Sequence, residues 1–172
     1  MTTFFIIVAV FIFLILILHR SASKEQESNQ IKMQSKGYQI NKSIKTGKYI
    51  AGHPSLNNIV AKTDIFPVDD HLDIIDSSLI TQVKIASIEK SSIKNIVIED
   101  QTTIEKRVTV ARLLLIGIFA FALRKKQVNE IAYLIIEWND GRFDHETIFQ
   151  FEGKEAMVNA NTARNMIIKE LN

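Results

Sequence analysis

The first eighteen residues constrain the structure of this chain more than any other segment. No charged side chain occurs from Met1 to Leu18, and every residue from Phe4 onward in this stretch is aliphatic or aromatic. In lipid, all backbone N–H and C=O groups must be hydrogen-bonded within the segment, which restricts it to a helix. At about 1.5 Å per residue the stretch would be roughly 27 Å long, close to the ~30 Å of a bilayer core. We therefore predict a transmembrane anchor at residues 1–18.

A cleaved signal peptide is the alternative interpretation of this stretch. Signal peptides begin with basic residues, whereas only Thr2 and Thr3 lie between Met1 and the apolar run. Residues 21–23 are small enough to resemble a cleavage site, but His19 and Arg20 separate them from the apolar core. We therefore expect the anchor to be retained.

Basic residues after the span predict its orientation. The first positive side chains along the chain are Arg20, Lys24, Lys32 and Lys36. The positive-inside rule then places the C-terminal part in the cytoplasm of a single-pass cell-membrane protein. The absence of cysteine agrees with a reducing compartment. An exported domain with a binding role at the cell envelope is the alternative.

The rest of the chain divides into a polar linker and one domain. Residues 19–36 contain almost no apolar side chains and cannot bury enough surface to order themselves, so they read as a linker. Residues 37–172 are long enough for a single core. The net charge of +2 is too small to indicate nucleic-acid binding.

Short apolar runs separated by turn signals predict strands in this domain. Gly47–Asn58 is predicted to be a loop. Pro67 is expected to end the strand that immediately precedes the proline. The expected strands are Ile59–Phe66, His71–Ile75, Leu79–Ile88, Ile93–Glu99, Ile131–Trp138 and Phe143–Phe151. The strongest turn signal is Asn139–Arg142, because Asp-Gly supplies the positive φ that a tight hairpin needs.

A final amphipathic helix is predicted at Lys154–Leu171. Its apolar positions recur every three or four residues, at Ala156, Ala160, Ala163, Ile167 and Leu171. The fold class is therefore mainly β (α+β), a small barrel of about seven strands capped by one C-terminal helix.

This order of elements resembles the pleckstrin-homology-like (PH-like) superfold, including bacterial PH-like and GRAM-type domains. Locally, Ile88–Ile96 is similar to the third or fourth strand of many such domains, and Glu99–Leu115 to a segment of membrane-anchored bacterial proteins of this type. The resemblance covers roughly Tyr38 to Asn172 and implies seven strands in two near-orthogonal sheets with one terminal helix. The terminal helix lacks the tryptophan usual in eukaryotic members, and the first hairpin lacks a basic phosphoinositide motif, so the resemblance implies the fold alone.

A second apolar stretch, Leu113–Leu123, is too short to span a bilayer. It is flanked by six basic residues and one acid between residues 105 and 126. Three interpretations are open: a buried core hairpin, a loop that dips into the membrane, and an apolar patch for a protein partner. If this stretch dips into the membrane, seven residues are candidates for contact with lipid: Arg107, Arg112, Ile118, Phe119, Arg124, Lys125 and Lys126.

Recognised catalytic and metal-binding motifs are missing from the sequence. It has no phosphate-loop spacing, no Gly-x-Ser-x-Gly and no His-Glu-x-x-His. The acidic run at residues 69–73 reads as turn chemistry, and His145 reads as part of a surface strand. We therefore expect no catalytic residues, no cofactor and no metal. The expected function is a non-enzymatic binding or scaffolding module, whose partners are membrane lipids through the anchor and a protein.

Overall fold

The computed structural model describes residues 12, 13, 15, 20, 24, 27, 28, 30–56, 61–78, 82–100, 103 and 131–172. The chain divides into two compact units, Met1–Ile40 and Asn41–Asn172. Among the described residues, no helix is both long enough and apolar enough to cross a membrane.

In the first unit, residues 30–35 are helical and lie in the stretch that the sequence predicted to be a polar linker. The helix ends in a Schellman motif, in which the Tyr38 N–H donates to the Met33 carbonyl and the Gly37 N–H to the Gln34 carbonyl. Gly37 adopts φ +87°, the conformation that this motif requires. The glycine that marks the start of the predicted domain therefore ends a helix.

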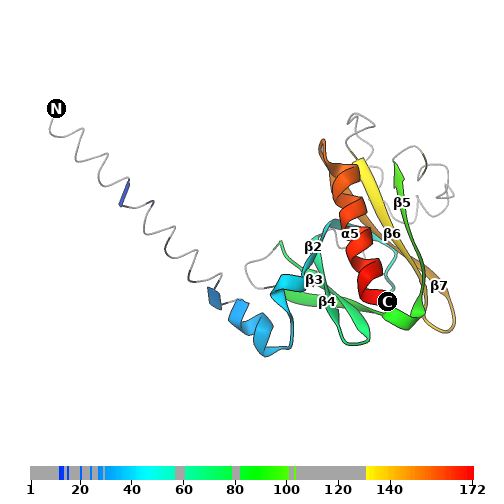
Figure 1. Cartoon of the computed structure of the whole chain (residues 1–172), viewed down its shortest axis with the longest axis horizontal. Helices are drawn as coiled ribbons and strands as arrows, with labels where there is room; N and C mark the ends of the chain where they lie inside the picture. Colours follow the sequence, from blue (N-terminus) through cyan, green and yellow to red (C-terminus); the bar gives the residue numbers. More distant parts are fainter. Residues whose placement is uncertain are drawn as a thin grey trace. The chain divides into compact units, whose positions relative to one another are not determined.

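The second unit is a seven-stranded antiparallel sheet followed by one helix (Figure 1). The strand order is β4-β3-β2-β1-β7-β6-β5. The strands are β1 (Ile44–Ala51), β2 (Ala61–Val68), β3 (His71–Asp76), β4 (Val83–Glu89), β5 (Ile93–Asp100), β6 (Ile131–Asn139) and β7 (Asp144–Glu152). The helical elements are the 3-10 turns η1 (Ile40–Lys42) and η2 (Lys90–Ser92) and the helix α5 (Ala156–Leu171).

The sheet is not closed into the barrel that the sequence predicted. Among the described residues, the outer strand β4 pairs only with β3, and the outer strand β5 pairs only with β6. The three residues of η2 join these two outer strands, so the two ends of the sheet meet at one corner. Figure 1 shows β4 and β5 diverging from that corner. Because the two outer strands diverge, the sheet stays open although its ends are joined by η2.

Strand β1 lies where the sequence predicted the loop Gly47–Asn58. Gly47 adopts φ +74° at a bulge in the ladder with β2, where the register shifts between Lys45 and Gly47. A side chain at Gly47 would lie 2.3 Å from the Gln150 carbonyl oxygen. The glycine is therefore a site of close backbone approach within a strand rather than a strand terminator.

Strand β2 continues through Pro67, which the sequence analysis expected to end it. The ladder between β2 and β1 ends at Ile65, whereas the ladder between β2 and β3 continues to Val68. Pro67 thus lies where β2 has lost one neighbour, a position that tolerates the missing N–H. The predicted turn after β2 is confirmed, with Asp69 at φ +38°.

The predicted helix is confirmed, with its apolar stripe facing the sheet. Ala156, Ala160, Ala163 and Ile167 are buried, and Leu171 packs against the same core at its edge. Helix α5 contacts β1, β5, β6 and β7. Small alanine side chains let the helix backbone lie close to the strands, so the core under α5 is formed mainly by residues of the sheet.

Strand β6 is buried on both faces. Ala132, Leu134, Ile136 and Trp138 join the core under α5. Ile131, Tyr133 and Ile135 join a second apolar cluster, which also contains residues of β1 and β7.

Candidate functional site

The corner where the two ends of the sheet meet contains a cleft of about 790 Å³, which we call the corner cleft. It lies between the end of β4, η2, the start of β5 and the β6–β7 turn. Its lining includes Ser87, Ser91, Lys94, Trp138, Asn139 and Asp140. The cleft is therefore formed by segments that are far apart in the sequence, and its lining is mostly polar.

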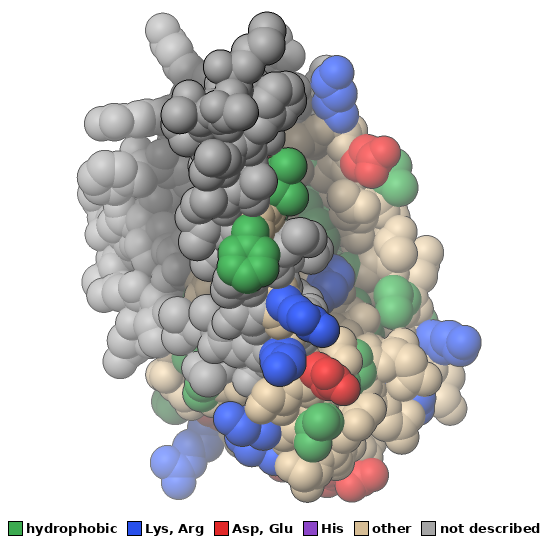
Figure 2. Space-filling view, turned by 90° about the vertical axis from the view of Figure 1, so that its left-hand side faces the viewer, with side chains coloured by type: hydrophobic (Ala, Val, Ile, Leu, Met, Phe, Trp, Pro, Cys, Tyr) green, Lys and Arg blue, Asp and Glu red, His purple; other side chains and the backbone are tan. Residues whose placement is uncertain are grey.

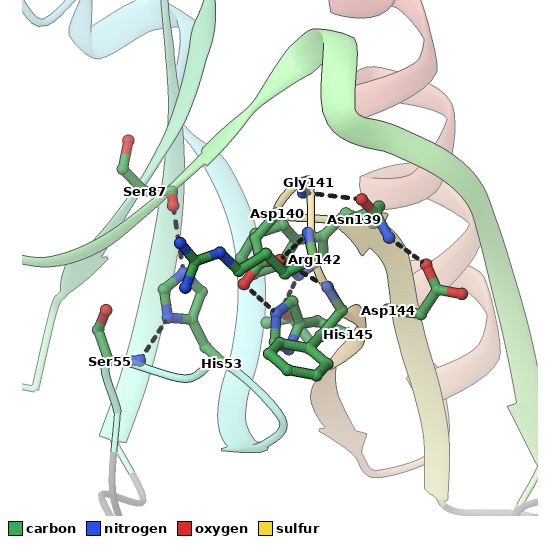
Figure 3. Close-up of polar contacts among 12 residues, drawn as sticks. His53, Ser55, Ser87, Asn139, Asp140, Gly141, Arg142, Asp144 and His145 are labelled. Carbon is green, nitrogen blue, oxygen red and sulfur yellow. Dashed lines mark hydrogen bonds and ion pairs between the residues drawn. The ribbon is translucent and has the colours of Figure 1, made fainter.

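His53 fastens the β1–β2 loop to the cleft wall. Its Nδ1 accepts a hydrogen bond from the Ser55 N–H at 3.2 Å, and its Nε2 lies 3.1 Å from the Ser87 carbonyl oxygen on β4 (Figure 3). Because a carbonyl can only accept, Nε2 carries the proton and the imidazole is neutral in this arrangement. The side chain is buried, which fits a neutral ring with both nitrogens hydrogen-bonded.

Trp138 lies between two histidines and completes what we call the ring stack, His53–Trp138–His145. The ring centroids are 5.2 Å apart for His53 and Trp138, and 4.6 Å apart for Trp138 and His145. The Trp138 indole N–H donates to Thr147 Oγ1 at 2.9 Å, which fixes the ring plane. The stack thereby joins the β1–β2 loop to β6 and β7.

Asn139 and Asp140 stiffen the β6–β7 turn above the stack. Asp140 Oδ1 accepts hydrogen bonds from the backbone N–H groups of Arg142 and Phe143, while Asp140 Oδ2 lies 2.9 Å from His145 Nε2. Asn139 Oδ1 accepts from the Gly141 N–H. The turn is therefore held in one shape before any partner binds.

Two ion pairs lie beside the cleft, Lys94 with Asp144 and His145 with Asp140. Hydrogen bonding to His145 holds the pKa of the Asp140 carboxyl well below its ordinary value, and the Phe143 and Arg142 amides add to this effect. Lys94 bonds Asp144 at 2.5 Å and, together with Asn139, lowers the pKa of Asp144. On the face drawn in Figure 2, Lys and Arg side chains lie among Asp and Glu side chains. The lining of the cleft also combines both signs, with Lys94 beside Glu89 and Asp140.

Burial is the main influence on the titration of His53. It lowers the pKa of the imidazole below the ordinary 6.5, the hydrogen bond to the Ser87 carbonyl raises it, and the charge of His145 lowers it again. Burial likewise raises the pKa of Tyr49, whose hydroxyl accepts a hydrogen bond from the His53 N–H. Both groups are therefore neutral at pH 7.

The hydrogen bonds of Ser87 argue against a nucleophilic role. Its Oγ donates to Asp73 Oδ1 at 2.6 Å, and Asp73 also pairs with Lys84 at 2.8 Å. His53 contacts the Ser87 carbonyl rather than the hydroxyl, and both of its ring nitrogens are already hydrogen-bonded. A general base has to reach the proton that it removes, so this histidine and serine are arranged for structure rather than for acyl transfer.

The acidic run after β2 is divided between two environments. His71 Nδ1 pairs with the neighbouring carboxylate of Asp70 at the surface, whereas Asp73 is buried. The seven candidate membrane-contact residues between Arg107 and Lys126 lie outside the described residues, as does the whole of Leu113–Leu123. Of the residues of this acidic run, His71 lines the corner cleft.

Sequence reasoning missed both histidines of the ring stack. His145 lies on strand β7, as predicted, and its side chain is partly exposed, but the ladder also places it opposite Trp138, which the sequence analysis did not foresee. A hairpin closed by Asn139 and Asp144 implies that pair directly, so a signal was present in the sequence. His53 lay in an expected loop, and its contact with Ser87 across the sheet has no local signal.

No protein-family model matches this chain, and no curated protein matches it either.

Proposed function

We propose that this protein is a single-pass membrane protein that presents a PH-like, non-enzymatic binding or scaffolding domain at the membrane surface. The corner cleft is the observation that carries the binding role. It is the place where the two ends of the sheet and a stiffened hairpin come together. Its partners would be protein at the cleft and lipid at the anchor.

The element order supports the PH-like assignment. Seven antiparallel strands form a single turned sheet whose outer strands meet at η2, and one helix follows at the C-terminus. This succession agrees with the resemblance seen in the sequence, although the sheet is open. The assignment concerns the fold and implies no particular ligand.

The apolar stretch supports the anchor. Ile12, Phe13 and Ile15, the described residues of Met1–Leu18, are helical, and each has at least half of its surface exposed. Apolar side chains on a helix with this exposure are stabilised by lipid contact. The anchor would hold the domain near the bilayer, so that even weak contacts act at a high effective concentration.

The composition of the corner cleft favours a protein partner. Its lining carries charges of both signs, with Lys94 beside Glu89 and Asp140, and the adjoining turn presents Arg142 and the 66% exposed Phe143. Arginine and aromatic side chains are the residues that most often anchor protein interfaces. A preorganised turn also reduces the entropy lost on binding.

Site-specific photocrosslinking in living cells tests this proposal. A photoreactive amino acid replaces Ser91 at the cleft in the full-length protein, and the matched control replaces Asn165 on the exposed side of α5. We expect a discrete crosslinked protein from position 91 that is absent from position 165. Equal products from both positions, or none from position 91, would contradict a binding role for the cleft.

A further inference from the structure

We propose that the outer edge of β5 is a pairing surface for a second copy of this chain, and that Arg164 on α5 keeps this surface closed. The outer edge is the side of β5 that faces away from β6. The proposal goes beyond the binding role of the corner cleft and depends neither on that cleft nor on the anchor. One side chain of the helix would thus decide whether two copies of the open sheet can join.

The two outer strands of an open sheet present backbone N–H and C=O groups with which another strand can pair. On β4, the Ser87 carbonyl accepts a hydrogen bond from the side chain of His53. On β5, no strand among the described residues pairs with the outer edge. The question at β5 is therefore what satisfies its outward backbone groups in a single copy.

Ile96, in the middle of β5, directs both of its backbone polar groups to side chains rather than to β6. Its N–H donates to Asn95 Oδ1 at 2.9 Å, and its carbonyl accepts a hydrogen bond from Arg164 Nε at 2.7 Å. In an antiparallel ladder the N–H and C=O of a residue point to the same side, and this side alternates along the strand. Ile98 and Asp100 therefore share the outward direction of Ile96. We call Asn95 and Arg164 the edge cap.

The packing of α5 holds Arg164 at this edge. Ala163 and Ile167 on either side of it are buried in the core, and Arg164 itself is partly buried. The helix contacts β5 as well as β6. The guanidinium is always charged, and a charged donor makes a stronger hydrogen bond to a carbonyl than a neutral donor does. A partner strand would have to displace this bond in order to pair with Ile96.

The sequence of β5 is self-complementary when two copies pair antiparallel about Val97. Ile96 of each copy then lies opposite Ile98 of the other, on the face where Ile96 joins the core under α5 and Ile98 packs against that core. Val97 lies opposite its own counterpart on the other face. At both ends of the pairing, Lys94 of one copy comes near Asp100 of the other. Cross-strand pairs of β-branched residues and of unlike charges stabilise a ladder, which favours a second copy as the partner strand.

The size of the expected effect follows from the bond that is lost. Pairing of two copies breaks the hydrogen bond between Arg164 and Ile96 in each of them. A hydrogen bond to a charged group typically changes an equilibrium by about tenfold or more. A variant without the guanidinium should therefore pair at least about tenfold more readily than the native chain does.

Disulfide trapping in the full-length protein tests the proposal, because the chain contains no cysteine. Val97→Cys places one thiol at the centre of the expected pairing, in a non-hydrogen-bonded pair whose Cα atoms would be about 4.5 Å apart, within the range of a disulfide. The purified protein in detergent micelles is oxidised mildly, and the linked dimer is measured on a non-reducing gel. We expect at least about tenfold more dimer when Arg164→Met, which has no donor, is added to Val97→Cys.

Three controls separate the edge cap from other effects. Lys169→Met removes a charge from an exposed position of the same helix and should leave the Val97→Cys dimer unchanged. Val83→Cys, on the other outer strand, should give the same amount of dimer with and without Arg164→Met. Arg164→Lys keeps a cationic donor, so it should give less Val97→Cys dimer than Arg164→Met does.

Two results would overturn the proposal. One is a Val97→Cys dimer that is equally abundant with and without the guanidinium of Arg164. The other is an increase of the same size at Val83→Cys or with Lys169→Met, because neither of these involves the edge cap. Should Arg164→Met fail to fold, Asn95→Ala at the exposed half of the cap takes its place. It leaves the Ile96 N–H open to a partner strand and should raise the Val97→Cys dimer by a smaller factor, and no increase there would refute the proposal.

Discussion

At the scale of single residues, two glycines with the same kind of backbone conformation differ in what surrounds them. Gly52 and Gly141 both adopt positive φ, at +98° and +92°. A Cβ at Gly52 would lie 1.6 Å from the Glu146 carbonyl oxygen, whereas a Cβ at Gly141 would meet nothing within 4 Å. Both positions would strain any residue with a side chain, and they differ in packing, so substitutions at the two sites form a matched pair.

We predict that Gly52→Ala destabilises the domain more than Gly141→Ala does. Gly141→Ala should cost about 1–2 kcal/mol, the strain of an L-residue with positive φ. Gly52→Ala should exceed that cost by at least ~1 kcal/mol, because β1 and β7 must also move apart. Chemical unfolding of the full chain measures both values, and equal losses would show that the contact with Glu146 does not constrain the strand.

Single residues also show how much of the candidate site could be predicted from the sequence. Trp138 and His145 become neighbours once the Asn139–Asp144 pair closes the hairpin, so that half of the ring stack was within reach of pattern reasoning. His53 was not, because its position depends on how far the sheet turns between β1 and β4. Side chains that meet through the turning of a sheet leave no periodic signal.

At the scale of elements, the helix was the easiest feature to predict and β1 the hardest. The four buried residues of α5 recur at the helical period, and tertiary packing leaves that pattern intact. In β1, Gly47 permits a bulge that local rules interpret as a loop. The open sheet was missed for a different reason, since strand number and turn spacing do not specify closure.

We predict that the packing of α5 tolerates little added volume on its buried face. Ala160 is fully buried, so Ala160→Leu should destabilise the domain by about 1–3 kcal/mol by forcing the helix away from the sheet. The same residue placed at exposed Asn165 should change stability by no more than about 0.5 kcal/mol. Thermal unfolding of both variants measures the difference, and a neutral Ala160→Leu would contradict close packing of α5.

At the scale of the whole molecule, stability should fall in two steps as the medium is acidified. The pKa of His53 is lower in the folded state than its ordinary 6.5, so the unfolded chain takes up this proton first and stability declines below pH 6.5. Asp140 and Asp144 have folded pKa values below the ordinary 3.8, so their contribution is present above that value and is lost as the pH falls further.

The free energy of unfolding, measured from pH 8 to pH 3, tests these signs. We expect His53→Gln to remove the upper step and Asp140→Asn to reduce the lower one, with each variant leaving the other step in place. An upper step that is unchanged in His53→Gln would show that another group titrates there.

The membrane assignment gives the molecule its context, and one accessibility measurement tests it most directly. Ser35, exposed and close to the end of the helix at residues 30–35, is replaced by cysteine in a chain that otherwise contains none. Intact and lysed cells are then treated with a thiol reagent that does not cross membranes, and the membranes are washed at alkaline pH. We predict labelling only after lysis and retention of the protein in the washed membranes. Labelling of intact cells would place the domain outside, and release into the wash would contradict the anchor itself.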